Sequence, residues 1–217
     1  MAVRGVVFDF DGLILDTETP EFESWACVFA SHGATLEPNE WANCVGGGEV
    51  PWKVEDHLAE LVPGIDVRAA EAEVRRIRDA RLLEISPRPG VFEILSLLDD
   101  MQIPFAIASS SRHLWVDGHL QNHGLRDRFP IIWTADRVGA KKPDPKVYLA
   151  AVAELGTNPA ETLAFEDSTN GLLAAKRAGM AAVAIPNPVT ASFDLSLADR
   201  RLESLLQADR RFLEQFA

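Results

Sequence analysis

The sequence predicts an α/β protein with a parallel β-sheet and a helical domain inserted after its first strand. Short, continuously apolar segments alternate with helical patterns along most of the 217 residues, which is typical of strands covered on both faces by helices. This alternation stops once, over residues 18–86, where only helical patterns occur. Because the sites of parallel sheets lie at the carboxyl ends of their strands, the residues that follow each strand are the candidates for function.

The expected strands are short runs of apolar and β-branched residues bounded by turn residues. They occupy residues 3–8, 103–108, 130–134, 161–165 and 181–185. The expected helices between them open at a proline or a capping side chain and close at a glycine. These helices occupy residues 90–101, 145–155 and 168–179, with Ser168 as the N-cap of the last one. From residue 190 to 217 we expect polar, partly amphipathic helix.

The inserted segment is expected to form several helices of its own, at residues 20–32, 38–45, 52–62 and 67–84. The last of these has Val67, Ala70, Val74 and Ile77 on one face, as an amphipathic helix requires. The expected organisation is therefore a core domain of residues 1–17 and 87–217 and an inserted helical domain of residues 18–86. Since the insert begins directly after the loop of the first strand, we expect it to lie over that loop.

Composition excludes several kinds of partner. The chain has 33 acidic and 21 basic residues and a formal net charge of −12, which argues against nucleic acid and against an anionic membrane surface. Neither a bilayer-spanning apolar run nor a signal peptide is recognisable in the sequence. We therefore expect a cytoplasmic protein that acts on a small molecule.

The first strand ends in the motif D-F-D-G, residues 9–12. Burying the carboxylates of Asp9 and Asp11 beside an apolar strand would be costly without a compensating cation. A hard divalent cation with oxygen ligands removes that cost. Gly12 allows the chain to turn at this point.

Further polar groups follow the later strands in a fixed order. The second strand ends at Ser109-Ser110-Ser111, Lys141-Lys142 follows the third, and the fourth ends at Glu166-Asp167. Each group alone has an ordinary explanation as a loop or a solvated surface. Taken together, the groups predict phosphoryl chemistry. The acids can hold a metal ion, and the hydroxyl and the lysine can bind phosphate oxygens.

On these motifs the chain resembles the haloacid dehalogenase-like hydrolase superfamily. The resemblance is to the branch with a helical cap inserted after the first motif, which includes β-phosphoglucomutase and phosphoglycolate phosphatase. All four motifs are present in order, as D-F-D-G at residues 9–12, Ser109, Lys142 and Glu166-Asp167. The resemblance implies a doubly wound, Rossmann-like parallel-sheet core with a small α-helical cap domain, and it implies Mg²⁺ as cofactor.

The resemblance also implies roles for individual residues. Asp9 is the expected nucleophile that forms an aspartyl-phosphate. Asp11 is the expected general acid and base, and it also offers its backbone carbonyl to the metal. Ser109 and Lys142 are expected to hold the transferring phosphoryl oxygens, with Ser110 beside them as a substrate-binding residue. The expected metal ligands are Asp9, Asp11, Asp167 and Glu166, the last directly or through water.

The cap is expected to supply specificity. Gly47 lies in a glycine-rich stretch between two helical patterns and is a candidate substrate-facing residue, as are Glu21 and Arg78. Glu21 occupies the position at which the mutases of this branch carry a histidine, which disfavours mutase activity. The five tryptophans are interpreted as packing residues of the core and cap.

The leading hypothesis is a phosphatase of a small organic phosphomonoester, either a sugar phosphate or a phosphoglycolate-like acid, acting as a monomer or homodimer. Asp11 favours phosphate esters over haloacids, because an alkoxide leaving group needs a proton and a halide does not. Two alternatives remain open. One is a phosphomutase, and the other is a non-catalytic, receiver-like regulator that binds phosphate.

Overall fold

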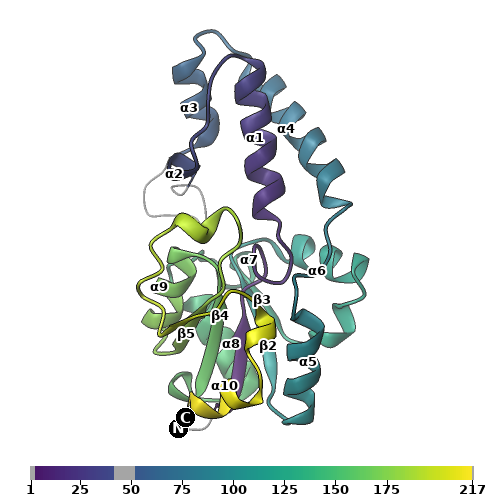
Figure 1. Ribbon diagram of the computed structural model, residues 1–217, viewed down its shortest axis with the longest axis vertical. Coiled ribbons are helices and arrows are strands. Elements are labelled where there is room, and N and C mark those ends of the chain that lie inside the picture. Colours follow the sequence, from purple (N-terminus) through teal and green to yellow (C-terminus); the bar gives the residue numbers. More distant parts are fainter. Residues whose placement is uncertain (1–2, 42–51, 217) are drawn as a thin grey trace.

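The computed structural model describes residues 3–41 and 52–216, which form a parallel sheet with helices on both faces and a group of helices beyond one end of the sheet (Figure 1). The sheet order is β3-β2-β1-β4-β5-β6, and every neighbouring pair of strands is parallel. This is the strand order of the doubly wound Rossmann fold. The predicted fold class is confirmed. The strands are β1 (Gly5–Phe8), β2 (Phe105–Ser109), β3 (Ile132–Thr134), β4 (Thr162–Glu166), β5 (Ala181–Ala184) and β6 (Arg200–Arg201).

The register of the central strands brings the sequence motifs to one edge of the sheet. Phe8, the last residue of β1, pairs with Ile107 of β2 on one side and with Phe165 of β4 on the other. Asp9, one residue further on, donates its backbone N–H to the carbonyl of Phe165. The chain therefore leaves β1 beside the ends of β2 and β4, which carry the hydroxyl and acid motifs.

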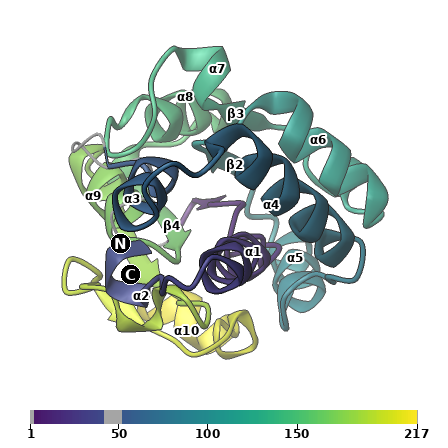
Figure 2. The same cartoon turned by 90° about the horizontal axis from the view of Figure 1, so that it is seen from above.

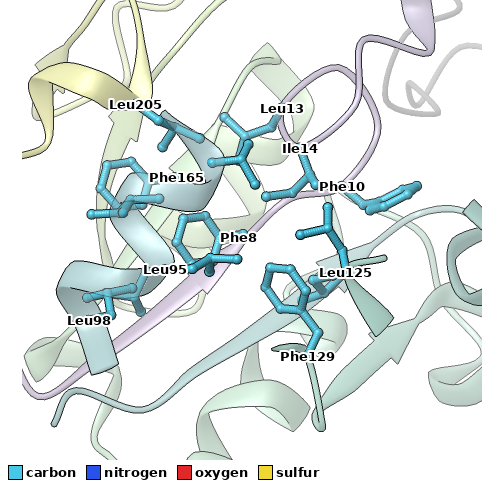
Figure 3. Packing of buried hydrophobic residues seen from close by; sticks show 14 of the residues in the cluster. Phe8, Phe10, Leu13, Ile14, Leu95, Leu98, Leu125, Phe129, Phe165 and Leu205 are labelled. Atoms are coloured by element: carbon cyan, nitrogen blue, oxygen red, sulfur yellow. The ribbon is translucent and has the colours of Figure 1, made fainter. Parts of the chain in front are cut away.

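Alternate strand residues pack into two separate core layers, because successive side chains of a strand point to opposite faces. One layer holds large side chains, among them Phe8 and Phe165, whose rings stack 5.4 Å apart (Figure 3). Helices α5 (Val91–Asp100), α6 (His113–Asn122) and α10 (Arg210–Gln215) cover this layer. The other layer has alanines on its strands and is covered by α8 (Lys146–Leu155) and α9 (Thr169–Arg177).

The inserted segment forms the expected helical cap. Its helices are α1 (Glu18–Ser31), α2 (Pro38–Trp41), α3 (Val54–Leu61) and α4 (Val67–Leu82). They bury an apolar cluster that includes Trp25, Phe29, Leu58 and Val74 and to which the core contributes Val189. Seen from above, α1, α3 and α4 lie over the carboxyl ends of the strands (Figure 2). The cap therefore covers the edge of the sheet at which the motifs meet.

The prediction of a helix over residues 190–217 is wrong for most of this segment. Its described part, residues 190–216, contains the single turns η3 (Thr190–Ser192) and η4 (Leu205–Gln207), the edge strand β6, and only one short helix, α10. The physical reason is local competition from aspartates, which hydrogen-bond the backbone in non-helical conformations. Asp194 accepts from the N–H of Ser196, and Asp199 accepts from the N–H of Ala182 in β5 and from Lys176.

The structure also contains elements that the sequence patterns do not predict. Helix α6 follows β2, and the short α7 (Ala135–Val138) follows β3. The remaining single turns are η1 (Arg126–Arg128) and η2 (Pro159–Glu161). In the described ranges, every helix is too short or too polar to traverse a lipid bilayer.

Candidate active site

A cavity of about 400 Å³ lies between the carboxyl end of the sheet and the cap. The core contributes Asp9, Asp11, Ser110, Lys142 and Asp167 to its walls, and the cap contributes Glu21 of α1 and Arg78 of α4. Two further predicted site residues, Ser109 and Glu166, are fully buried behind these walls. Gly47 falls outside the residues that the structure describes. The remaining predicted site residues are thus assembled in one place.

The turn after β1 is possible only with glycine at position 12. Gly12 has a φ of 81°, and a Cβ atom placed on it would lie 2.2 Å from the carboxylate oxygen Oδ2 of Asp167. No side chain fits at that distance, and L-residues rarely adopt that φ. Gly12 therefore permits the expected turn, and it also allows the loop of β1 to approach the loop of β4.

Lys142 is a buried cation between two buried carboxylates. Its ammonium donates hydrogen bonds to Asp9 Oδ1 and to Glu166 Oε1, the latter at 2.6 Å. Burial by itself would lower the pKa of Lys142, but the adjacent charges of Asp9 and Glu166 outweigh burial and raise this pKa. The lysine is therefore held as an ammonium ion beside the predicted nucleophile.

Glu166 is fixed by hydrogen bonds from the protein. Oε1 accepts from Lys142 and from the hydroxyl of Tyr148 at 2.6 Å, and Oε2 accepts from Ser168 Oγ at 3.1 Å and from the backbone N–H groups of Asp167 and Ser168. Gly171 lies so close that a Cβ there would be 1.9 Å from the Glu166 carboxyl group. These contacts favour a role in orienting Lys142, and the direct ligation of a metal by Glu166 stays a prediction.

Asp9, Glu166 and Asp167 form a buried cluster in which one carboxylate oxygen of each lies within 4.8 Å of the others. Burial and the charges of Glu166 and Asp11, offset in part by Lys142, raise the pKa of Asp9 to about 8. Burial, together with the charges of Asp9 and Glu166, also raises the pKa of Asp167 well above its usual range. One ammonium does not balance the negative charge of three clustered carboxylates, and oxygen ligands of this kind suit a hard divalent cation.

Asn187 positions Asp167 and is not predicted from the sequence. Its side-chain N–H donates to Asp167 Oδ2 at 2.7 Å, while its Oδ1 accepts from the backbone N–H groups of Val189 and Thr190, both at 2.9 Å. The side chain is buried, and its loop follows β5. The signal available in the sequence is a polar residue between two prolines directly after the fifth apolar segment, residues 186–188.

Arg88 is a second supporting residue that the motifs do not reveal. Its guanidinium donates to three backbone carbonyls, those of Gly12, Ile185 and Pro186. Burial lowers the pKa of Arg88, although Asp167 and Asp16 act in the opposite direction. The side chain joins the loop of β1 to the loop of β5, on either side of Asp167.

The carboxylate of Asp11 accepts four hydrogen bonds. Oδ1 accepts from Thr17 Oγ1 at 2.9 Å and from the indole N–H of Trp115 at 2.8 Å, and Oδ2 accepts from Ser111 Oγ at 2.6 Å and from Ser109 Oγ at 3.2 Å. The hydroxyl of Ser109 thus contacts Asp11 in this structure, and its expected contact with a phosphoryl group stays a prediction. Asp11 is held in one orientation at the wall of the cavity.

Trp115 of α6 connects Asp11 to the cap. The guanidinium of Arg78 lies over its ring, 5.8 Å from the ring centre, and forms an ion pair of 3.1 Å with Glu21. The interpretation of all tryptophans as packing residues is therefore incomplete, because this one also donates a hydrogen bond to a predicted catalytic carboxylate and lines the cavity. Its position on an unpredicted helix explains why the motifs do not reveal it.

Comparison with known proteins identifies the family to which this arrangement of acids, lysine and cap belongs. The model of the family described as haloacid dehalogenase-like hydrolase matches residues 6–185, which include all four motifs. The chain belongs to this family. The resemblance stated from the motifs is confirmed, and so is the prediction of a hydrolase.

Curated relatives cover almost the whole chain. It is 42% identical over 213 residues to "Putative phosphatase YhcW" of Bacillus subtilis (strain 168), which spans 97% of this chain and 96% of that protein. It is 30% identical over 217 residues to hexitol phosphatase B of Escherichia coli (strain K12), with 94% of each chain covered. It is 31% identical over 181 residues to the fructose-1-phosphate phosphatase YqaB of the same organism, covering 82% of this chain and 94% of that one.

Solved structures share the fold. One is a haloacid dehalogenase family hydrolase from Deinococcus radiodurans R1, described as having bound phosphate and sodium. It superposes with a TM-score of 0.79 and 26% sequence identity, and the match covers 98% of this chain and 96% of that one. This similarity extends over both the sheet and the inserted helices.

Proposed function

We propose that this protein is a Mg²⁺-dependent phosphatase that hydrolyses a small organic phosphomonoester through an aspartyl-phosphate on Asp9. The observation that carries the proposal is the Asp9 carboxylate at the wall of the cavity, within hydrogen-bonding reach of the buried Lys142 ammonium and clustered with Asp167. A carboxylate can attack a phosphoryl group only if positive charge reduces the repulsion between the two anions.

The carboxylates of Asp9 and Asp167 and the backbone carbonyl of Asp11 are the groups that would hold Mg²⁺. When bound, this ion neutralises charge on the nucleophile and on the phosphoryl oxygens. Lys142, which pairs with Asp9, would bind one of the same oxygens. The hydroxyl of Ser110 lines the cavity on the side of β2 and would supply a neutral donor to the phosphoryl group.

The chemistry then has two steps. In the first, an oxygen of Asp9 forms a bond to phosphorus, the bond from phosphorus to the leaving-group oxygen breaks, and Asp11 donates a proton to that oxygen. In the second, Asp11 removes a proton from water, the water oxygen attacks phosphorus, and the bond between Asp9 and phosphorus breaks. Thr17, Trp115, Ser109 and Ser111 keep Asp11 at the cavity wall for both transfers.

The named activities of two relatives support a sugar or sugar-alcohol phosphate as substrate. Those proteins are called a hexitol phosphatase and a fructose-1-phosphate phosphatase. A cavity of about 400 Å³ is of the size that accepts a molecule of this kind.

The test is phosphate release by the purified protein from sorbitol 6-phosphate, fructose 1-phosphate and p-nitrophenyl phosphate. We expect turnover with at least one substrate in millimolar Mg²⁺, its loss in excess EDTA, and its recovery when Mg²⁺ is restored. Activity that is unaffected by EDTA would contradict the metal assignment. Binding of phosphate without any turnover would favour the receiver-like regulator instead.

The same assay separates the phosphatase from a phosphomutase. A mutase isomerises a sugar phosphate without net release of phosphate. Glu21, which the motif resemblance aligns with the mutase histidine, forms an ion pair with Arg78. A carboxylate committed to an ion pair does not replace a histidine in proton transfer, so we expect net phosphate release.

Asn187 provides a separate test of the metal site. Replacing it with alanine removes the hydrogen bond to Asp167, and loss of such a supporting contact typically weakens metal binding by about 10- to 100-fold. Calorimetric titration with Mg²⁺ should show this weakening, and activity should recover at high Mg²⁺. Asn158→Ala is the control, because Asn158 lies outside the cavity and its side-chain N–H donates to the partly exposed Glu161. Unchanged Mg²⁺ affinity in Asn187→Ala would contradict the positioning role.

A further inference from the structure

The cap side of the cavity contains a carboxyl group that the mechanism does not use. Glu18 is the first residue of α1 and lines the cavity together with Glu21, Arg78 and Trp115. It directly follows Thr17, whose hydroxyl donates to Asp11. Glu18 therefore lies next to the predicted general acid, on the side of the cavity from which a leaving group would depart.

Glu18 differs from the other acids of the site in its hydrogen bonding. Asp9 and Glu166 accept from Lys142, Asp11 accepts from four donors, and Glu21 accepts from Arg78. Within residues 3–41 and 52–216, we find no side chain or backbone group that donates a hydrogen bond to the carboxyl group of Glu18. The residue is partly exposed and lines the cavity, so its carboxyl group is open to a hydrogen-bond partner that arrives with the substrate.

The charge around Glu18 restricts what that partner can be. Burial, together with the charges of Asp11, Glu21, Asp9 and Asp16, raises the pKa of Glu18 to about 8. On the cap side Arg78 is already paired with Glu21 and Asp79. The exposed Lys141 lines the cavity from the core. An anionic group beside Glu18 would therefore meet several acids and an arginine that is already neutralised.

A hydroxyl group fits this environment better than an anion or an apolar group. It can donate to the carboxylate form of Glu18 and accept from the protonated form, so it satisfies the carboxyl group in either state. The phosphoryl group is an unsuitable partner, because it is anionic and is drawn toward Lys142 at the sheet. The hydrogen-bond partner of Glu18 is therefore expected to be part of the leaving group.

We propose that Glu18 is a specificity-determining residue that hydrogen-bonds a hydroxyl of the leaving group, so that the site selects uncharged, polyhydroxylated leaving groups and rejects those that carry a carboxylate. The proposal rests on the proposed phosphatase function and narrows its substrate class. It favours sugar and sugar-alcohol phosphates over phosphoglycolate-like acids.

The experiment compares Glu18→Leu and Glu18→Gln with the unmodified protein on four substrates. Sorbitol 6-phosphate and fructose 1-phosphate have uncharged leaving groups with hydroxyls, p-nitrophenyl phosphate has an aromatic leaving group without a further hydroxyl, and phosphoglycolate has a carboxylate. Glu23→Gln is the control, because Glu23 is exposed on the same helix and pairs with Arg81 outside the cavity. Thermal unfolding of each variant shows whether the fold is retained.

For the unmodified protein we expect kcat/KM to be higher for the better of the two sugar substrates than for phosphoglycolate. Glu18→Leu should lower kcat/KM for that sugar substrate by about 10- to 100-fold, which corresponds to the loss of one hydrogen bond to a charged or buried group, and should change p-nitrophenyl phosphate by less than about threefold. At pH 9, above the raised pKa of Glu18, Glu18→Gln keeps hydrogen-bonding capacity and removes the charge, so it should raise kcat/KM for phosphoglycolate by at least about fivefold.

Two results would overturn the inference while leaving the phosphatase intact. One is an equal loss on all substrates in Glu18→Leu, which would indicate a structural role at the start of α1. The other is a preference of the unmodified protein for phosphoglycolate over both sugar substrates. If the unmodified protein releases phosphate from none of the four compounds, the proposed function fails and this inference with it.

Discussion

Replacing Asp9 with asparagine is expected to abolish phosphate release and to leave the fold intact. The amide cannot attack phosphorus as the carboxylate does, and removal of a nucleophile typically lowers kcat by at least about a thousandfold. The fold should survive because Lys142 keeps its ion pair with Glu166 and because asparagine has nearly the shape of aspartate. The thermal unfolding midpoint should therefore change by only a few degrees.

Two measurements check this prediction. The first is steady-state phosphate release, with Asp127→Asn as a control that removes an exposed carboxylate outside the cavity. The second is mass spectrometry of acid-quenched reactions, in which the unmodified protein should carry a phosphoryl group on Asp9 and the variant should carry none. Near-normal turnover by Asp9→Asn would show that the nucleophile is another residue.

Replacing Lys142 with methionine should cause the largest loss of stability of any change at the site. The Lys142 side chain is 2% exposed and its ammonium lies between Asp9 and Glu166, so its removal leaves two buried carboxylates without their cation. Breaking a buried pair in this way typically costs about 3–5 kcal/mol. Phosphate release should be lost as well, because the repulsion between Asp9 and the phosphoryl group is no longer offset. Urea unfolding in EDTA measures the stability change.

A second variant separates the two consequences of losing Lys142. Glu166→Gln in the Lys142→Met background removes one of the stranded charges and should restore part of the stability without restoring activity. Lys141→Met is the matched control for stability, because this neighbouring lysine is exposed and surface changes usually alter the free energy of unfolding by less than about 0.5 kcal/mol. A Lys142→Met protein as stable as the unmodified one would contradict the buried ion-pair interpretation.

The sequence is sufficient to predict the core of the site because its residues lie at strand ends. Asp9, Ser109 and Asp167 each directly follow or end an apolar strand, and parallel strands bring their carboxyl ends to a common edge. Lys142 needs one further step, since it lies in a loop between α7 and α8. Its position in the chain, after the serine motif and before Glu166-Asp167, is what indicates that it belongs to the site.

The supporting residues are harder to predict because their roles depend on tertiary position. Trp115 contacts Asp11 across 104 residues of sequence, and Tyr148 reaches Glu166 from the buried face of α8. An aromatic residue on a helix normally indicates packing, and nothing local distinguishes these two from the rest. Glu18 is similar, because an acid in the first turn of a helix has an ordinary explanation in the helix dipole.

The C-terminal segment shows a different limit. Its leucines have helical spacing in places, but Leu195, Leu205 and Leu213 pack against different parts of the core. The aspartates between them bind backbone N–H groups, and one of them joins the segment to β5 as an edge strand. Such a contact requires a partner strand, so no pattern within the segment predicts it.

The unequal side chains on the two faces of the sheet link the interior of the protein to its chemistry. The alanine-lined face lets α8 approach closely enough for the Tyr148 hydroxyl to reach Glu166 at 2.6 Å, and Glu166 in turn orients Lys142. The spacing between a helix and a sheet thereby sets the position of a charge at the reaction centre. Residues such as Ala106 and Ala108 of β2, a strand on which α8 packs, consequently belong to the functional constraint on this chain, although they contact no substrate.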